Sequence, residues 1–249
     1  MNFKEYSKYY DIIYKNKKYD VEANYIHELI SKFNPNSNSI LNLGCGTGNH
    51  DFLLQKLNYK IVGLDLSKEM IEIANEKNKS DDLKFIYSNI QEFDLNQKFD
   101  NVISLFHVMS YQKDNYELDK VFSNVERHLN NEGVFIFDFW YGPAVLTDLP
   151  INKKINFKEG NVKILRKTKS KVDYNRNIVN VNFQLEIEDE GTQLSIEENH
   201  EMRYLFLPEL EYLLKKNNLE IINSSKFMSE DTMSEKSWYG IIIAKKCKK

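Results

Sequence analysis

The stretch "ILNLGCGTGNH", residues 40–50, interrupts an apolar run with glycines at positions 44, 46 and 48 and then turns polar. When a strand leads directly into glycine-rich backbone and a helix, N–H groups are exposed at the helix N-terminus, and the missing Cβ atoms let a ligand approach the main chain. In an open α/β sheet, such a loop lies at the carboxyl ends of the strands. We therefore expect a small-molecule site around residues 44–50.

An acidic residue follows the glycines at an informative distance. The next apolar run, "KIVGLDL", ends in Asp65, and a carboxylate about 20 residues beyond such a loop can accept hydrogen bonds from ribose hydroxyls. The loop and the acid together predict an adenosine-containing cofactor. The alternative is a plain tight turn beside a polar residue that only flanks a helix.

The spacing of the glycines separates two kinds of cofactor. Dinucleotide-binding folds usually carry G-x-G-x-x-G, whereas Gly44, Gly46 and Gly48 follow G-x-G-x-G. This spacing favours a ligand smaller than a dinucleotide. An NAD-binding oxidoreductase therefore remains an alternative that the glycine spacing disfavours.

Composition and charge narrow the class of protein. The 249 residues are 41% hydrophobic, enough for a sizeable core, and the net charge of -3 comes with scattered Lys and Arg residues. The Lys and Arg residues form no basic stripe of the kind that binds a phosphate backbone, so we do not expect a nucleic-acid partner. No signal-peptide core and no run of about 18 apolar residues is visible, so we expect a cytoplasmic protein without a membrane partner. Cys45 and Cys247 form no CxxC pair, which argues against a disulfide framework and a metal site.

The order of apolar patterns predicts an α/β domain. Residues 3–33 carry apolar and aromatic side chains at helical spacing and fit two helices. From residue 39 to residue 140, short apolar runs alternate with amphipathic ones, as in parallel strands joined by helical crossovers. Ser67 is expected to cap one of these helices. Residues 1–150 would thus hold the N-terminal helices and the cofactor-binding core.

The pattern changes after Pro150. Residues 152–206 show the two-residue alternation of β-strands in "NVKILRKTKS", "NIVNVNFQLEIE" and "QLSIEENHEMRYLF", with turns expected at "DYNRN" and "EDEGT". We therefore expect residues 151–206 to form an antiparallel β insertion that caps the substrate. Residues 207–249 contain a helical pattern and two strand patterns. They are expected to complete the core sheet.

Three motifs in order carry a family resemblance. "LNLGCGTGNH", "VGLDLSKEMI" and "FDNVISLFHVMSY" closely resemble the class I S-adenosylmethionine-dependent methyltransferases. The resemblance covers nearly the whole chain. It implies a Rossmann-like sheet, mostly parallel with its last strand antiparallel, an N-terminal helical lid and S-adenosyl-L-methionine as the cofactor.

The resemblance also assigns cofactor contacts to residues of this chain. The glycine loop would hold the methionine part, with Asn49 or His50 beside it, and Asp65 would hold the ribose. Asn89 stands where the family usually has an acid for the adenine amine, and its side-chain carbonyl can accept the same hydrogen bond. The complete set of predicted cofactor-binding residues is Gly44, Cys45, Gly46, Asp65, Leu66, Met70, Asn89, Ile90, Leu105 and Tyr19.

Two residues are candidates for catalysis. His107 follows the fourth strand at its carboxyl end and is the leading candidate for a general base, with packing against the cofactor as the alternative. The segment "YSKYYDIIYKNKKYD" resembles the lid helix of a subgroup that includes N-methyltransferases of nucleotide-linked amino sugars. That resemblance implies that Tyr14 faces the sulfonium or its carboxylate.

Four residues are candidates for binding the acceptor. Trp140 and Tyr141 end the fifth strand, where their rings would stack on a sugar or base or else fill the core. "HEMRYLFLPELEYLL" resembles the segment that returns to the sheet in the sugar-modifying subgroup. Arg203 would bind a substrate phosphate or carboxylate with His200 beside it, or else form a surface ion pair.

The sequence therefore predicts methyl transfer from S-adenosylmethionine to a nitrogen or oxygen of a small polar acceptor, with an amino sugar or nucleotide-linked sugar preferred. An O-methyltransferase acting in surface-polysaccharide biosynthesis is the nearest alternative. A non-catalytic cofactor-binding protein is an alternative of another class. Strand pairing at the edge of the insertion would allow a homodimer.

Overall fold

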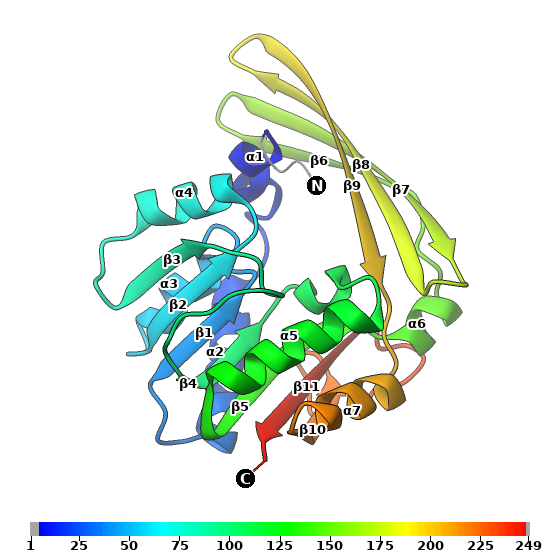
Figure 1. Cartoon of the computed structure of the whole chain (residues 1–249). Helices are drawn as coiled ribbons and strands as arrows, with labels where there is room; N and C mark the ends of the chain where they lie inside the picture. The colour runs from blue at the N-terminus through cyan, green and yellow to red at the C-terminus, as the bar shows by residue number, and fades with distance from the viewer. Residues whose placement is uncertain (1–4, 248–249) are drawn as a thin grey trace.

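The computed structural model describes residues 5–247, so residues 3 and 4 of the predicted helical stretch lie outside the described part. A seven-stranded sheet has the order β10-β11-β5-β4-β1-β2-β3 (Figure 1). Its strands are β1 (Ser39–Leu43), β2 (Lys60–Asp65), β3 (Leu83–Tyr87), β4 (Phe99–Ser104), β5 (Leu129–Trp140), β10 (Leu219–Lys226) and β11 (Tyr239–Lys246). The helices are α1 (Tyr6–Ile13), α2 (Tyr19–Phe33), α3 (Asn49–Gln55), α4 (Lys68–Lys77), α5 (Asn115–His128), α6 (Gly142–Thr147), α7 (Leu207–Lys216) and the 3₁₀ helix η1 (Val108–Tyr111).

The direction of the strands confirms the predicted Rossmann-like sheet. β1 pairs in parallel with β2 and β4, and β4 pairs in parallel with β5. β11 runs antiparallel to both of its neighbours, β5 and β10. Because the parallel strands all point the same way, their carboxyl ends, with the loops that follow them, lie along one edge of the sheet.

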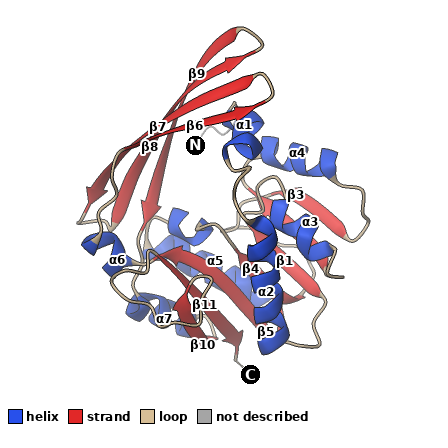
Figure 2. Ribbon diagram, turned by 180° about the vertical axis from the view of Figure 1, so that it is seen from behind, coloured by secondary structure: helices blue, strands red, loops and turns tan. Residues whose placement is uncertain are grey.

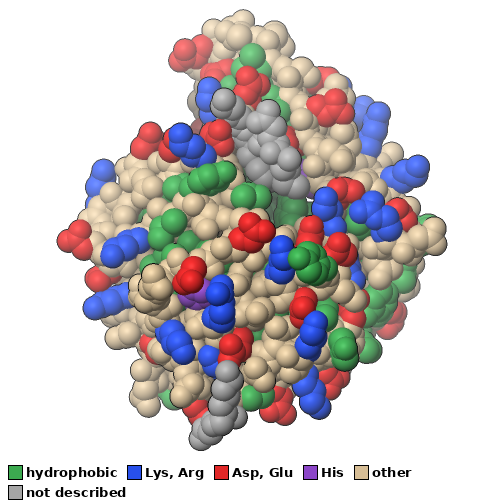
Figure 3. Space-filling view, viewed as in Figure 1, with side chains coloured by type: hydrophobic (Ala, Val, Ile, Leu, Met, Phe, Trp, Pro, Cys, Tyr) green, Lys and Arg blue, Asp and Glu red, His purple; other side chains and the backbone are tan. Residues whose placement is uncertain are grey.

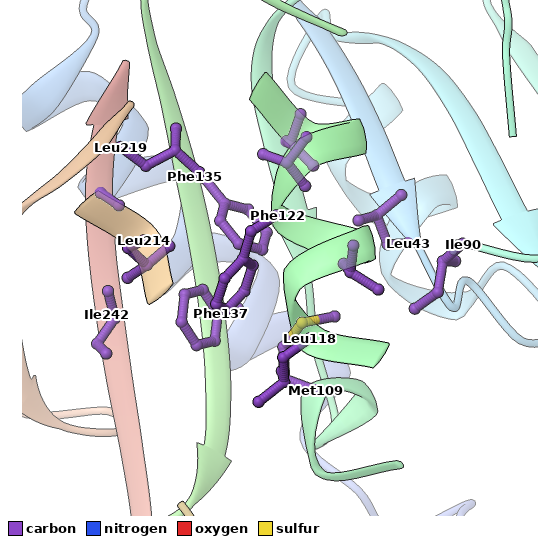
Figure 4. Close-up of a cluster of buried hydrophobic side chains, with 14 of the residues drawn as sticks. Leu43, Ile90, Met109, Leu118, Phe122, Phe135, Phe137, Leu214, Leu219 and Ile242 are labelled. Atoms are coloured by element: carbon purple, nitrogen blue, oxygen red, sulfur yellow. The ribbon is translucent and has the colours of Figure 1, made fainter. Parts of the chain in front are cut away.

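Side chains of each strand alternate between two apolar clusters on opposite faces of the sheet. In β5, Phe135, Phe137 and Phe139 belong to the cluster under α5 and α7, whereas Val134 and Ile136 belong to the cluster under α2, α3 and α4. Figure 4 shows aromatic rings of the first cluster between α5 and the sheet. The two-residue period of a strand thus produces a three-layer α/β/α core.

The two layers of helices can be seen from opposite sides. α5 and α7 lie in front of the sheet in Figure 1, and α2 and α3 lie in front of it in Figure 2, which views the molecule from behind. No helix among residues 5–247 has both the length and the apolar character needed to cross a membrane.

A second sheet is formed by the region between the core strands β5 and β10. Its order is β6-β7-β8-β9, all pairs antiparallel, with β6 (Lys153–Glu159), β7 (Val162–Asp173), β8 (Ile178–Asp189) and β9 (Thr192–Arg203). Both views show it reaching from α6 to α1, on the side of the carboxyl ends of the core strands. Its inward residues pack with α1 in a third apolar cluster.

Two elements of this region are absent from the sequence-based prediction. β6 has the sequence KKINFKE, and almost all of it is exposed, so no buried apolar face marks it as a strand. It forms because it pairs along its whole length with β7. The short helix α6 contains a glycine and a proline at its start, so its local sequence predicts a turn more strongly than a helix.

Candidate active site

The glycine loop joins β1 to α3 at the carboxyl edge. Gly44, Gly46 and Gly48 all have positive φ values, 81°, 56° and 79°. A Cβ on Gly44 would lie 2.5 Å from a Val108 methyl carbon, so the glycine allows η1 to approach the loop. A Cβ on Gly46 would meet nothing within 4 Å. The first glycine is thus required by packing, whereas the second borders open space where a ligand can approach.

Asp65 ends β2 beside this loop. Its Oδ2 accepts a hydrogen bond from the Gly46 N–H at 2.8 Å, and its Oδ1 accepts one from the Ser67 N–H at 2.8 Å. Burial raises the pKa of the Asp65 carboxyl. Since a carboxylate oxygen can accept more than one hydrogen bond, both oxygens retain capacity for hydroxyl donors. The carboxylate therefore organises the loop and can still receive a ribose.

Five of the residues predicted to bind the cofactor differ in exposure. Leu66 is 63% exposed and offers an apolar surface next to Asp65. Met70 is buried in the apolar cluster of α1, while Ile90 and Leu105 are buried in the two core clusters. The Asn89 Oδ1 accepts the Gln91 N–H at 3.0 Å, which forms a local turn. Leu66 is the most exposed of these five residues, and the cofactor contacts of all five stay predictions.

Cys45 has no nucleophilic role in this geometry. Its N–H donates to the Leu64 carbonyl at 2.9 Å, and burial raises the pKa of its thiol well above the ordinary value. A buried thiol of raised pKa holds little thiolate. The side chain of Cys45 belongs to the apolar cluster under α2, α3 and α4.

The N-terminal helix is fastened to the glycine loop by a residue that the sequence analysis missed. Asp11 on α1 accepts hydrogen bonds from Thr47 Oγ1 at 2.8 Å and from Asn49 Nδ2 at 3.0 Å. Its other oxygen accepts one from Lys77 Nζ at 2.6 Å. Burial opposes ionisation of Asp11, but these donors lower its pKa overall. We call this set of contacts the Asp11 latch.

A second polar cluster lies where α2 meets α3. His50 Nε2 is 2.8 Å from Glu22 Oε2, and Glu22 also pairs with Lys17. The ring of Tyr19 packs edge-on against His50, with centroids 4.9 Å apart, and burial raises the pKa of Tyr19 to about 12. The predicted residues Tyr19 and His50 are therefore brought together at the glycine loop.

His107 is held by Asp138 at the carboxyl edge. Its Nδ1 lies 2.7 Å from Asp138 Oδ2, although the geometry is not that of a linear hydrogen bond, and its backbone N–H donates to Asp138 Oδ1 at 3.0 Å. The Tyr239 ring stacks on the imidazole at 4.4 Å and 15°. His107 has a φ of 63°, a left-handed conformation that costs a non-glycine residue about 1–3 kcal/mol.

Tyr14 ends α1 among other aromatic rings. Its hydroxyl accepts a hydrogen bond from the Tyr6 hydroxyl at 3.3 Å. Its ring packs edge-on against Phe106, 5.1 Å between centroids, and Phe106 is the neighbour of His107. The structure therefore brings the two predicted catalytic residues to one place.

Trp140 and Tyr141 differ in their surroundings. The Trp140 ring lies 6.3 Å from His107 and 5.4 Å from Trp238, and within residues 5–247 its buried indole N–H has no hydrogen-bond partner. Tyr141 packs against the core cluster under α5 and α7 and caps α6. Trp140 is thus the better placed of the two to face an acceptor.

His200 and Arg203 both come from β9 and are buried. His200 Nδ1 lies 3.0 Å from the Tyr111 hydroxyl, and burial lowers the pKa of His200 to about 4. Arg203 Nη2 donates to Glu209 Oε2 at 3.1 Å and to Asn115 Oδ1 at 2.6 Å. The ion pair of Arg203 is therefore internal and links β9 to α7.

The fold and this edge together define the class of protein. A mostly parallel sheet, a bare glycine loop after β1 and an acid at the end of β2 are the parts of a Rossmann-like fold that binds a nucleoside cofactor. Comparison with known proteins makes this more specific. Residues 35–246 match the family model described as a methyltransferase domain, and the chain belongs to that family.

Relatives with known names agree with this family. The chain is 29% identical over 153 residues to the dTDP-3-amino-3,4,6-trideoxy-alpha-D-glucopyranose N,N-dimethyltransferase of Streptomyces venezuelae, covering 61% of this chain and 64% of that protein. It is 28% identical over 145 residues to a dTDP-3-amino-3,6-dideoxy-alpha-D-glucopyranose N,N-dimethyltransferase of Streptomyces fradiae, covering 57% and 56%. These alignments span less than two thirds of the curated relatives.

Solved structures match over almost the whole chain. An S-adenosylmethionine-dependent methyltransferase from Clostridium acetobutylicum superposes with a TM-score of 0.83 at 25% identity, covering 98% of both chains. The sugar N-methyltransferase KedS8 from a Streptoalloteichus species gives 0.83 at 20% identity, covering 96% and 93%, which shows a shared fold. The predicted resemblance to class I methyltransferases is confirmed.

Proposed function

We propose that this chain transfers a methyl group from S-adenosylmethionine to the amine nitrogen of a nucleotide-linked amino sugar. The observation that carries the proposal is the His107–Asp138 pair, 2.7 Å apart, at the edge that also holds the glycine loop. η1, which begins next to His107, contacts Gly44 through Val108 and thereby fixes the pair beside that loop.

The residues at the edge suit this cofactor. Gly46 borders open space, and Asp65 retains acceptor capacity for two hydroxyls. Leu66 offers an exposed apolar side chain for an adenine ring. When bound, S-adenosylmethionine supplies an electrophilic methyl group on a sulfonium sulfur.

The chain's own residues would act by positioning and by removing a proton. Asp138 and Tyr239 fix the imidazole of His107, leaving Nε2 to take the proton that an ammonium acceptor loses. Trp140 offers an aromatic face and an indole N–H to the acceptor. The Tyr14 ring packs on Phe106, the residue before His107, and Tyr14 would orient the methyl group or the acceptor there. In-line transfer depends mainly on such alignment.

The choice of a sugar amine rests on the relatives. The curated proteins of Streptomyces venezuelae and Streptomyces fradiae are named as N,N-dimethyltransferases of dTDP-linked amino sugars. The four-stranded sheet β6–β9 supports the same choice, since it stands on the side of the carboxyl ends where it can cap a small-molecule site (Figure 1). Figure 3 shows Lys and Arg side chains interspersed with Asp and Glu on one face, without the basic stripe that nucleic acid would need.

Two matched acceptors test the proposal. Purified protein would be incubated with S-adenosylmethionine and either a dTDP-linked 3-amino-sugar or its 3-hydroxy counterpart, with products followed by mass spectrometry. We expect methylation of the amino-sugar alone. Methylation of the 3-hydroxy compound alone would show that the chain is an O-methyltransferase and would contradict the proposal.

The cytoplasmic location, the homodimer and a role in polysaccharide biosynthesis stay predictions. The dimer, which the sequence predicts through the edge of the insertion, can be tested by sedimentation of the purified chain. A mass of one chain at micromolar concentration would exclude it.

A further inference from the structure

Arg166 points into the molecule from the second sheet. In β7 it lies opposite Leu185 of β8, and Leu185 lies opposite Ile196 of β9. Directly opposed residues share a face of a sheet, and Leu185 and Ile196 are buried against α1. Arg166 is therefore on the inward face, together with buried apolar residues.

Aromatic rings surround the guanidinium of Arg166. Its Cζ lies 4.9 Å from the ring centroid of Phe183, 5.2 Å from that of Phe157 and 5.9 Å from that of Tyr14. Stacking on rings holds a guanidinium in place without using its N–H donors. The side chain is thus fixed while its hydrogen-bonding capacity is kept.

The charge of Arg166 is not compensated within the part of the chain that the structure describes. Among residues 5–247, no carboxylate lies within ion-pair distance of it, and its buried Nε has no hydrogen-bond acceptor. The other three arginines each have an oxygen partner. These pairs are Arg127 with Asn124, Arg176 with Glu201 and Arg203 with Glu209. An uncompensated inward cation is costly unless an anion joins it.

Arg166 also lies close to the proposed site of methyl transfer. The Tyr14 ring that it faces packs on Phe106, the residue before His107. One end of an acceptor at His107 could therefore reach Arg166 past these two rings. The dTDP-linked acceptors of the relatives carry a diphosphate, whose oxygens match the fork of a guanidinium.

We propose that Arg166 binds the diphosphate of the acceptor and so determines that the acceptor is nucleotide-linked. This rests on the proposed function, since it names the part of that acceptor which Arg166 recognises. The carboxylate of the cofactor is the other anion near the site, and the experiment separates the two.

The experiment titrates inorganic pyrophosphate, followed by calorimetry, into protein saturated with S-adenosylhomocysteine. Arg166→Met is compared with Lys167→Met. Lys167 is the adjacent residue, is on the opposite face of β7 and pairs with Glu186, so both variants lose one positive charge. We expect the Kd of pyrophosphate to rise at least about tenfold in Arg166→Met and to stay within about twofold in Lys167→Met.

Several results would overturn the inference. The inference fails if wild-type protein does not bind pyrophosphate, or if a folded Arg166→Met variant binds it as wild type does. It also fails if Arg166→Met loses affinity for S-adenosylhomocysteine but not for pyrophosphate. If Arg166→Met does not fold, Arg166→Lys decides, because it keeps the charge and loses the fork. A several-fold rise in its Kd supports the inference, and an unchanged Kd overturns it.

Failure of the proposed function would look different. In that case wild-type protein would bind S-adenosylhomocysteine but transfer no methyl group to the dTDP-linked 3-amino-sugar. Methylation of that sugar by wild-type protein, together with a pyrophosphate affinity that does not depend on Arg166, would remove only the present inference.

Discussion

At the scale of single residues, His107 carries most of the proposed chemistry, and its conformation depends on Asp138. The carboxylate holds both the backbone N–H and the imidazole of His107. Asp138 is therefore a positioning residue, because it would act on the acceptor only through the imidazole of His107.

Replacing Asp138 tests this role. We expect Asp138→Asn to lower kcat by about 10–100-fold, since a freely oriented base loses much of its effect, and to leave the Kd of S-adenosylhomocysteine unchanged. Steady-state kinetics and calorimetry measure the two quantities. Asp148→Asn, at an exposed aspartate after α6, is the control. Equal losses of cofactor affinity and kcat in Asp138→Asn would instead indicate a general disturbance of the fold.

The glycines provide a matched pair of substitutions. Gly44→Ala should destabilise the protein by about 1–3 kcal/mol, because its Cβ meets Val108 at 2.5 Å and its φ is 81°. Gly46→Ala should cost about 1–2 kcal/mol for its left-handed φ, yet lower the affinity for S-adenosylhomocysteine more than about tenfold, because its Cβ enters the open space where we propose that the cofactor binds. Urea unfolding and calorimetry measure both effects. Unchanged ligand affinity in Gly46→Ala would move the cofactor away from this loop.

Residue contacts also mark the limit of the sequence analysis. The roles of Gly44, Gly46 and Asp65 can be predicted because they depend on the spacing of these residues along the sequence. The partners Asp138 and Asp11 are not, since they lie 31 and 36 residues from the groups they bind and become neighbours only in the folded chain. Arg166 was missed because an arginine in an alternating strand looks like a solvent-facing residue.

At the scale of elements, the Asp11 latch joins α1 to the glycine loop and to the end of α4. α1 therefore has to separate from the loop if ligands enter beneath it. Asp11→Asn weakens the contacts with Lys77, Asn49 and Thr47 by removing the negative charge.

The latch makes a prediction about the mobility of α1. In Asp11→Asn, amide hydrogen exchange of Tyr6–Ile13 should accelerate about 5–30-fold, corresponding to about 1–2 kcal/mol of lost docking energy. Exchange within β4 and β5 should not change. Asp20→Asn, on the exposed side of α2, is the control. Acceleration of the same size in the control would show that the latch does not hold α1.

A buried pair connects β1 to α3 and predicts a dependence on pH. Asn42 Nδ2 donates to both carboxyl oxygens of Asp51, at 3.0 Å and 2.9 Å. Burial raises the pKa of Asp51 to about 7, from an ordinary value of 3.8. Between these two values the folded protein binds more protons than the unfolded chain, so this group lowers stability as pH rises and contributes a constant penalty above pH 7.

Asp51→Asn removes that titration. The free energy of unfolding of the variant minus that of the wild type should become more positive by about 1–3 kcal/mol between pH 5 and pH 8. Urea unfolding at the two pH values measures it. Subtracting the wild-type value removes the contribution of His200, because its lowered pKa makes both proteins more stable as pH rises. A difference that stays flat with pH would mean that Asp51 is not the titrating group.

Elements differed in how well the sequence predicted them. The core strands and helices were predicted because their apolar residues keep one period from end to end. β6 and α6 lack this signal, since one is an exposed edge strand rich in lysine and the other a short helix with an early proline. Their structure depends on pairing with β7 and on contacts around Leu205.

At the scale of the whole molecule, the proposed donor and acceptor sites have different origins. The proposed donor site lies at one edge of the α/β core and follows from local motifs. The proposed acceptor site draws on η1, β5, β11, α1 and the inward face of β6–β9. Its residues come from distant parts of the chain, so the sequence indicated the methyl donor more sharply than the acceptor.

The central claim is transfer of a methyl group to a sugar amine at this shared site. Its most direct measurement uses S-adenosylmethionine labelled with carbon-13 in the transferred methyl group, a dTDP-linked 3-amino-sugar, and NMR of the product. The account predicts a labelled methyl carbon bonded to the sugar nitrogen. A labelled methyl carbon on a hydroxyl oxygen, or no transfer by protein that binds S-adenosylhomocysteine, would contradict it.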